Sequence, residues 1–272
     1  MNTGSDPSRG QTPASIPEAV REQALYPFHE LPVPRAVQRF ELDGAAFTVN
    51  PFPGAQLAFP RRIDADIPGL VEAVREIGRE HGKETIAWWI GPEHESWAPV
   101  LEELGIVNAD TPGFEAIENA MALVTPPLEK PVEGVEVREL ETFDEFKAGS
   151  AVVIECFGFP ELPEEELRAR FEEHLADRDI GRSFFALVDG RVVGTAYAGF
   201  GTAGLNLFGG AVLPDARGRG VYRALLQARW AFAVERGTPA LTVQAGKMSM
   251  PVCERMGFRL VGRSRVFVDT LR

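Results

Sequence analysis

The chain of 272 residues is long enough for two domains of ordinary size or one large domain, and its 44% hydrophobic and 25% charged residues are typical of a soluble globular protein. The formal net charge of −12 at pH 7 argues against nucleic acid as a partner, because an acidic surface repels phosphate backbones. That charge weakly favours a cationic small molecule, or reflects solubility alone. No apolar run approaches the roughly 20 residues of a membrane helix, so we expect no membrane partner.

Neither the cysteines nor the histidines form a pattern typical of a metal or disulfide site. Cys156 and Cys253 are too few and too far apart for such a framework, and they fit a reducing cytoplasm. The histidines show no HExxH or similar pairing, so we expect no metal. Residues 1–20 are rich in Ser, Thr, Gly and Pro and lack the apolar core of a signal peptide, so we expect a flexible tail and no export.

A segment rich in Pro and Gly, residues 124–140, predicts a linker with a domain boundary near residue 131. The first domain, residues 21–130, is expected to contain strands and helices in alternation. In chain order they are a hairpin around Asp43-Gly44, an amphipathic helix over 67–82, a strand at 84–91, a helix over 95–106 closed by Gly105, and a strand at 121–124.

The second domain, residues 131–272, shows the same alternation in expanded form. Its expected elements are a strand at 135–140, helices at 143–156 and 163–176, strands at 183–190 and 191–200 joined through Asp189-Gly190, a strand at 205–212, a helix at 221–236, a strand at 240–245, a short helix at 248–256, and one or two closing strands at 258–271. Hairpins combined with a strand-loop-helix crossover predict a mixed α/β fold.

The stretch PDARGRGVYRALL, residues 214–226, places Gly218 and Gly220 between arginines just before a helix. Such a turn is a natural anion cradle, because the first N–H groups of a helix have no internal partner and carry the positive end of its dipole. A P-loop would need GxxxxGK[ST], which is absent. A dinucleotide fingerprint would need a third glycine where Arg223 stands. A phosphate or pyrophosphate is therefore the expected ligand.

The longer stretch VLPDARGRGVYRALL resembles the acetyl-CoA signature of the GCN5-related N-acetyltransferase (GNAT) superfamily, V-x-P followed by R/Q-x-x-G-x-G/A and a helix. PVCERMGFRLVG, residues 251–262, resembles the closing segment of that family, and the resemblance covers roughly residues 135–272. It implies an acyl-CoA N-acyltransferase fold and an acetyl-CoA-dependent N-acetyltransferase. The amine would attack the thioester directly, with acetyl-CoA as the donor and no metal.

The resemblance also implies which residues hold acetyl-CoA. The main chain of Gly210, Ala211 and Val212 would pair with the pantetheine arm, and the following turn would surround the pyrophosphate. The residues of that turn are Arg217, Gly218, Arg219, Gly220, Val221, Tyr222 and Arg223. Tyr222 stands where the family usually has Gly or Ala, so its side chain must point away from the cofactor or cover it. We expect Gly220→Val to abolish CoA binding and to leave the fold largely intact.

The resemblance leaves the catalytic residues unknown. Gly246 and Cys253 stand where many members have an Asn and a general-acid Tyr. Cys253 is a candidate general acid, although a lone Cys on the apolar face of a helix more often fills the core. Ser249 is a second candidate, although a Ser at the start of a helix more often caps it. Glu155 is a candidate general base, although the simpler interpretation is that it is an exposed carboxylate on a helix. The acidic residues at 161–166 are expected to stabilise the N-terminus of the following helix by their charge, before any role in catalysis is considered.

Residues 37–124 are similar, more weakly, to a GNAT domain that has lost its CoA turn, which favours a tandem chain with a degenerate N-terminal copy. Trp88, Trp89 and Trp97 belong to the core or line an acceptor pocket at the domain junction. Two alternatives stay open: a CoA-binding module without turnover, and a transferase of another acyl group. The acceptor is expected to be a small-molecule or peptide amine, and the protein a monomer or a homodimer.

Overall fold

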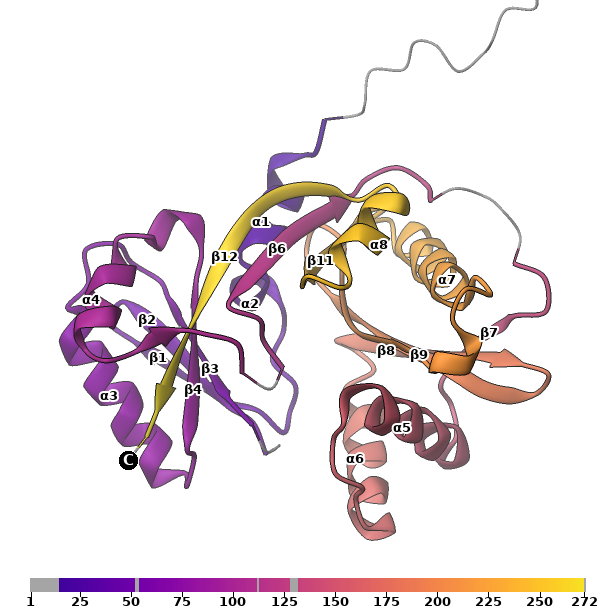
Figure 1. Cartoon of the computed structure of the whole chain (residues 1–272), viewed down its shortest axis with the longest axis horizontal. Coiled ribbons are helices and arrows are strands. Elements are labelled where there is room, and N and C mark those ends of the chain that lie inside the picture. Colours follow the sequence, from indigo (N-terminus) through magenta and orange to yellow (C-terminus); the bar gives the residue numbers. More distant parts are fainter. Residues whose placement is uncertain (1–14, 52–53, 112, 128–131, 272) are drawn as a thin grey trace, which may run out of the picture.

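The computed structural model describes residues 15–51, 54–111, 113–127 and 132–271. The chain forms two halves joined by a common sheet (Figure 1), with the N-terminal half in indigo to magenta and the C-terminal half in salmon to yellow. The strands β6 and β12 pass between the halves.

The N-terminal half contains the helices and strands expected from the sequence together with several others. Its elements are α1 (Glu18–Leu25), α2 (Pro27–Glu30), β1 (Gln38–Leu42), β2 (Ala45–Val49), β3 (Gln56–Pro60), α3 (Ile67–Glu80), β4 (Thr85–Ile90), η1 (Pro92–His94), α4 (Trp97–Glu103), β5 (Val107–Asn108) and β6 (Ile117–Leu123). The elements α1, α2, β3 and β5 were not predicted. Of the tail expected over residues 1–20, residues 1–14 lie outside the described residues, whereas α1 begins at Glu18 and buries Val20.

The C-terminal half follows the predicted order closely. Its elements are β7 (Glu136–Glu139), α5 (Phe143–Phe157), α6 (Glu164–Ala176), β8 (Gly181–Val188), β9 (Arg191–Phe200), β10 (Leu205–Val212), η2 (Pro214–Ala216), α7 (Val221–Glu235), β11 (Leu241–Ala245), α8 (Met250–Arg255) and β12 (Arg259–Thr270). The Asp189-Gly190 hairpin is confirmed, since both residues have positive φ, 50° and 77°. The closing segment is one long strand.

The two halves exchange their closing strands within one sheet of twelve strands. The order along the sheet is β1-β2-β3-β4-β12-β6-β11-β10-β9-β8-β7, and β5 pairs with β12. The strand β6 of the N-terminal half lies beside β11, with Leu123 opposite Leu241. The last part of β12 pairs instead with β4, where Thr270 lies opposite Thr85. Each half is therefore completed by a strand from the other half.

The same arrangement occurs once in each half. The strands β3 and β4 are parallel and joined through α3, and β10 and β11 are parallel and joined through α7. A short helix then ends at a glycine between apolar residues, at 104–106 in one half and at 256–258 in the other. The closing strand follows each of these helices. The chain is thus a structural repeat in which only the second copy carries the Gly-rich turn.

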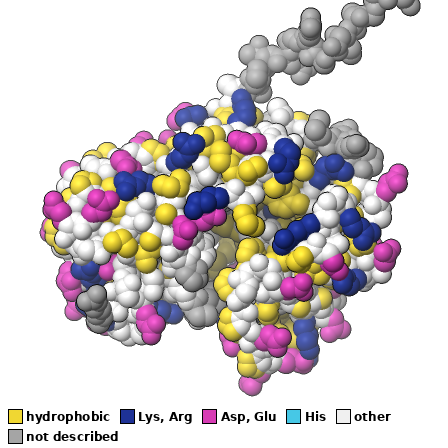
Figure 2. All heavy atoms as spheres, in the orientation of Figure 1, with side chains coloured by type: hydrophobic (Ala, Val, Ile, Leu, Met, Phe, Trp, Pro, Cys, Tyr) yellow, Lys and Arg dark blue, Asp and Glu magenta, His cyan; other side chains and the backbone are white. Residues whose placement is uncertain are grey.

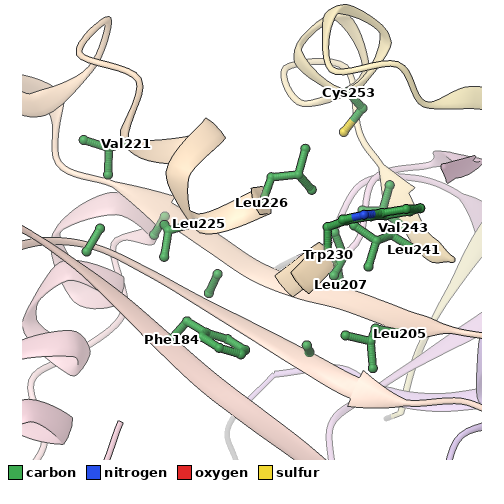
Figure 3. Close-up of a cluster of buried hydrophobic side chains, with 14 of the residues drawn as sticks. Phe184, Leu205, Leu207, Val221, Leu225, Leu226, Trp230, Leu241, Val243 and Cys253 are labelled. Atoms are coloured by element: carbon green, nitrogen blue, oxygen red, sulfur yellow. The ribbon is translucent and has the colours of Figure 1, made fainter. Parts of the chain in front are cut away.

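Each half has its own apolar core between its sheet and its crossover helix. In the C-terminal half Leu225 and Leu226 of α7 lie over Leu205 and Leu207 of the sheet, and the Cys253 side chain points from α8 into the cluster (Figure 3). Each such fully buried apolar side chain contributes about 1.5–3 kcal/mol to folding. This core fixes α7, and with it the turn that precedes α7, on the sheet. Within the described part of the chain no helix is long and apolar enough to cross a bilayer.

Candidate functional site

A bulge in β10 interrupts the pairing of this strand with β9. Phe208 lies opposite Tyr197 and Ala211 opposite Thr195, so the register shifts at Gly209 and Gly210, and Gly209 has a φ of +57°. On the other side of β10, the pairs with β11 run only from Leu205 to Leu207. The main chain from residue 208 to 212 therefore faces the widening gap between β10 and β11. A ligand that offers amide groups can pair with it there.

The turn before α7 leaves the helix N-terminus open. Gly218 and Gly220 are both left-handed, with φ of +78° and +84°, and no side chain caps the helix. At the equivalent place in the N-terminal half, the Asp66 carboxylate accepts a hydrogen bond from the Gly69 N–H and caps α3 itself. The first N–H groups of α7 are thus available to an external anion, whereas α3 already carries its own.

Three arginines surround this open N-terminus. Arg217 is held against the end of β10, because its Nε donates to the Val212 carbonyl at 3.1 Å. Arg219 is exposed. Arg223 lies over the turn, since a Cβ added at Gly220 would be 3.3 Å from its Nη2. Cationic groups around a helix N-terminus suit a pyrophosphate.

A side chain at Gly220 would meet both a steric contact and an unfavourable backbone conformation. A Cβ at this position would lie 2.8 Å from Cγ1 of Val132, and the backbone has the positive φ that side chains disfavour. A side chain at Gly220 is therefore expected to strain the turn, and the expectation that Gly220→Val leaves the fold largely intact stays a prediction. At Gly218 an added Cβ would meet no atom within 4 Å, although its φ is also positive.

The Tyr222 ring lies between the β10 bulge and α8. A Cβ added at Gly210 would be 3.1 Å from Cε2 of Tyr222, and the Tyr222 hydroxyl lies 3.9 Å from Sγ of Cys253. The ring thus lies against the bulge at Gly210, and its orientation relative to the cofactor stays a prediction. Burial raises the pKa of Tyr222 to about 12, so the phenol stays protonated around neutral pH.

A buried arginine accompanies Tyr222. Arg229 of α7 is 1% exposed, and its Nε donates to the Leu225 carbonyl at 3.1 Å. Its Nη2 has no hydrogen-bond partner among the described residues, and its guanidinium carbon lies 5.9 Å from the centre of the Tyr222 ring. Burial lowers the pKa of Arg229. The sequence signal for this group, an arginine on the otherwise apolar face of α7, was overlooked.

The three catalytic candidates from the sequence lie in different surroundings. Cys253 is fully buried in the core, and burial raises the pKa of its thiol. Ser249 makes no cap bond to α8, so its interpretation as a helix cap is wrong, and its Oγ lies 3.4 Å from the Gly246 carbonyl. Glu155 is exposed on α5. None of the three stands out as a proton-transfer group.

Two glutamates that the sequence reasoning missed lie at the end of β11. The Glu115 carboxylate accepts a hydrogen bond from the Lys247 N–H at 2.8 Å, and a Cβ added at Gly246 would collide with it. The absence of a side chain at Gly246 therefore makes room for a carboxylate from the N-terminal half. Glu118 is only 7% exposed and accepts a hydrogen bond from the Glu115 N–H at 2.9 Å.

Glu118 faces the same side of the sheet as Phe208. Asn206, Thr242 and Ala122 lie opposite one another on β10, β11 and β6. Side chains alternate between the two faces along a strand, and Phe208 is two residues from Asn206 whereas Glu118 is four residues from Ala122, so both side chains are on the same face as this row. Both lie towards the end of the sheet that holds the β10 bulge. Burial raises the pKa of Glu118 to about 7, and the charges of Glu115 and Asp110 act in the same direction. A carboxyl that is half ionised near neutral pH is suited to general-base catalysis.

The tryptophans are core residues. Trp88, Trp89 and Trp97 are 0%, 3% and 0% exposed, which contradicts the interpretation that they line a pocket. A cavity does lie between the two halves, but other residues line it. Among the described residues there is no group of three or more His, Cys, Asp or Glu side chains placed to hold a metal ion.

Several solved structures share this fold over nearly the whole chain. A GCN5-related N-acetyltransferase from Kribbella flavida aligns with a TM-score of 0.67 at 15% identity, covering 94% of this chain and 96% of its own. One from Sphaerobacter thermophilus gives 0.62 at 19%, covering 86% and 82%. A tandem GNAT protein from the clavulanic acid biosynthesis pathway gives 0.62 at 15%, covering 93% and 94%. The chain therefore has the acyl-CoA N-acyltransferase fold.

The sequence of the C-terminal half matches a family model. Residues 146–258 match the acetyltransferase (GNAT) family model. The chain thus carries a GNAT domain, and the class of enzyme that this domain defines is an acyltransferase. Among curated proteins no sequence gives a significant match.

Proposed function

We propose that this protein is an N-acetyltransferase that moves the acetyl group of acetyl-CoA to an amine by direct attack. The observation that carries this proposal is the uncapped N-terminus of α7, which lies beside the β10 bulge and is surrounded by Arg217, Arg219 and Arg223. An anionic group and an amide-bearing arm are the two features of CoA that such a site would recognise.

The proposal assigns the cofactor site to residues 210–223 and the catalytic domain to residues 131–272. The main chain of Gly210, Ala211 and Val212 would pair with the pantetheine arm, and the N–H groups at the start of α7 would bind the pyrophosphate. The N-terminal half would be a degenerate copy, because Asp66 caps its equivalent helix and would repel a phosphate.

Proton transfer needs one acceptor and one donor. Glu118 would take a proton from the attacking amine as the nitrogen bonds to the thioester carbon. The carbonyl oxygen would gain negative charge, which a main-chain N–H of the bulge would stabilise. The C–S bond would then break, and the Tyr222 hydroxyl would protonate the CoA thiolate, with Arg229 stabilising the phenolate.

Tyr222→Phe is accordingly expected to lower kcat at least tenfold with little change in the Kd for CoA. An unchanged kcat would show that Tyr222 does not donate this proton.

The remaining features of the proposal follow from the chemistry. The acceptor is a small-molecule or peptide amine, and neither nucleic acid nor a membrane takes part. Attack of an amine on a thioester needs positioning and proton transfer, so the proposal includes no metal. The two free cysteines fit a reducing compartment, and we propose a cytoplasmic location.

Turnover tests this function. Acetyl-CoA and a panel of amines are incubated with the full-length protein, and release of the CoA thiol is measured together with the mass of the amine product. We expect thiol release that depends on the amine and a product heavier by one acetyl group. CoA binding without any product would favour the CoA-binding module, which is supported by Gly246 and the fully buried Cys253 at positions where many family members have an Asn and a general-acid Tyr. A stronger response to a longer acyl-CoA would favour another acyl donor.

A further inference from the structure

A cavity of about 270 Å³ lies between the two halves. The N-terminal half contributes the loop that contains Val33 and Val37 and the strand residue Leu57. The C-terminal half contributes Tyr197 and Phe208. In the space-filling view the surface is hollowed between the two halves (Figure 2). An apolar cavity of about 150 Å³ is already sufficient to bind benzene, so this one has room for a substituted aromatic ring.

The inner wall of this cavity adjoins the backbone of the proposed thioester site. Phe208 immediately precedes the two bulge glycines, and its ring centre lies 6.2 Å from that of Tyr197, its register partner. Glu118 projects from the same face of the sheet towards the same end. A molecule in the cavity can therefore present one end to the bulge while its body stays between the halves.

The lining determines which kind of molecule fits. Most of its side chains are aliphatic or aromatic, and among the described lining residues there is no carboxylate. The one charged group in that part of the lining is the cation Arg39, whose Nε is 2.6 Å from a Glu41 oxygen. Tyr197 is neutral, since burial raises its pKa to about 12. A second cationic group on the ligand would find no carboxylate partner among the described lining residues and would lose part of its hydration.

We propose that this cavity is the acceptor pocket and that the acceptor is a primary amine on an apolar, preferably aromatic, body. This inference rests on the proposed function and adds the substrate class. Acceptors that carry several cationic or hydroxyl groups, such as polyamines and amino sugars, would fit poorly. The N-terminal half, which lacks an open CoA turn, would then supply one wall of the acceptor pocket.

Steady-state kinetics with four amines tests the pocket. The probes are 2-phenylethylamine, tryptamine, spermidine and glucosamine, each with acetyl-CoA and the full-length protein. We expect kcat/KM for the two arylalkylamines to exceed that for the two polar amines at least tenfold. If CoA binds and the polar amines are acetylated equally well or better, the inference is overturned while the proposed function stands. If CoA does not bind, the proposed function itself fails.

A variant in the N-terminal wall tests the role of that half. Val33→Asp, in the half-buried loop, is expected to raise the KM for 2-phenylethylamine at least tenfold and to change the Kd for CoA less than twofold. Val37→Asp serves as a second variant if Val33→Asp does not fold. The matched control is Val107→Asp, whose side chain is 56% exposed on the same half and which should change neither constant. An unchanged KM for 2-phenylethylamine in a folded Val33→Asp or Val37→Asp protein would overturn the inference. So would a variant that changes only the KM for the acyl donor, measured with hexanoyl-CoA, because the cavity would then hold the acyl chain.

Discussion

At the scale of single residues, Glu118 is the group whose surroundings determine its chemistry most clearly. Its carboxyl is buried, accepts one backbone N–H and lies near the carboxylate of Glu115. The cost of charging a group out of water is the largest cause of the raised pKa, the charges of Glu115 and Asp110 add to it, and the single backbone hydrogen bond opposes it. The same residue in an exposed helix would have an ordinary carboxyl pKa.

Glu118→Gln should therefore change the dependence of activity on pH. We expect the wild-type kcat/KM to fall as pH decreases through about 7, because the carboxyl becomes protonated. In the variant the decrease of kcat/KM through pH 7 should be absent, and the maximal kcat/KM should drop by about 10²-fold or more. The part of the pH profile that reflects ionisation of the amine itself should remain. A variant that keeps the wild-type profile would show that Glu118 takes no part in proton transfer.

The same substitution makes a prediction about stability. The folded-state pKa of Glu118 lies above its value of about 4.5 in the unfolded chain, so its favourable contribution is present below pH 4.5 and is lost as pH rises through about 7. At pH 8 Glu118→Gln should raise the free energy of unfolding by about 1–3 kcal/mol relative to wild type, with little effect at pH 4. Urea denaturation at the two pH values measures this difference, and equal effects at both would contradict the burial of the charge.

At the scale of elements, the exchanged strand β12 is anchored in the opposite half by an ion pair. The Arg75 guanidinium of α3 binds the Asp269 carboxylate with Nε–Oδ2 and Nη2–Oδ1 distances of 2.8 and 3.0 Å, and the Asp269 side chain is 4% exposed. This interaction raises the pKa of Arg75. The pair joins the end of β12 to the crossover helix of the N-terminal half.

Asp269→Asn should consequently destabilise the protein by about 3 kcal/mol, because it leaves the Arg75 cation partly buried without its counter-ion. Chemical denaturation followed by circular dichroism measures the change. The control is Glu164→Gln, which removes an exposed partner of Lys147 and Arg168 and should have no measurable effect. Equal stability of the two variants would mean that the anchor contributes little.

Most of the elements were predictable because their signals are local. The Asp189-Gly190 turn, the glycine at the end of α3 and the apolar face of α7 each act over a few residues. The exchange of β6 and β12 was not predictable, because pairing between distant strands leaves no local mark on either sequence. For the same reason no local pattern marks Glu118 as buried, and no local pattern at Gly246, where many family members have Asn, indicates that the Glu115 carboxylate lies against it. The boundary at residue 131 stays a prediction.

At the scale of the whole molecule, the exchange couples the two halves. The sheet is continuous, and β11 is covered on its outer edge only by β6 of the other half. An uncovered β11 would present a free edge for aggregation. Neither half is therefore expected to be stable on its own.

Thermal unfolding should accordingly be a single cooperative transition, with calorimetric and van't Hoff enthalpies in agreement. Residues 131–272 produced alone should aggregate, and production together with residues 1–130 should restore a soluble complex. Two well-separated transitions, or a soluble and monomeric C-terminal fragment, would contradict this coupling.

The most direct test of the central claim is calorimetric titration of CoA and acetyl-CoA into the full-length protein and two variants. Arg219→Ala removes a cation from the open turn before α7, and Arg62→Ala removes one from the closed turn before α3. We predict micromolar binding to the wild type, about −8 kcal/mol, with about a tenfold weaker Kd for Arg219→Ala and no change for Arg62→Ala. No binding to the wild type, or equal losses in both variants, would contradict the assignment of CoA to the α7 turn.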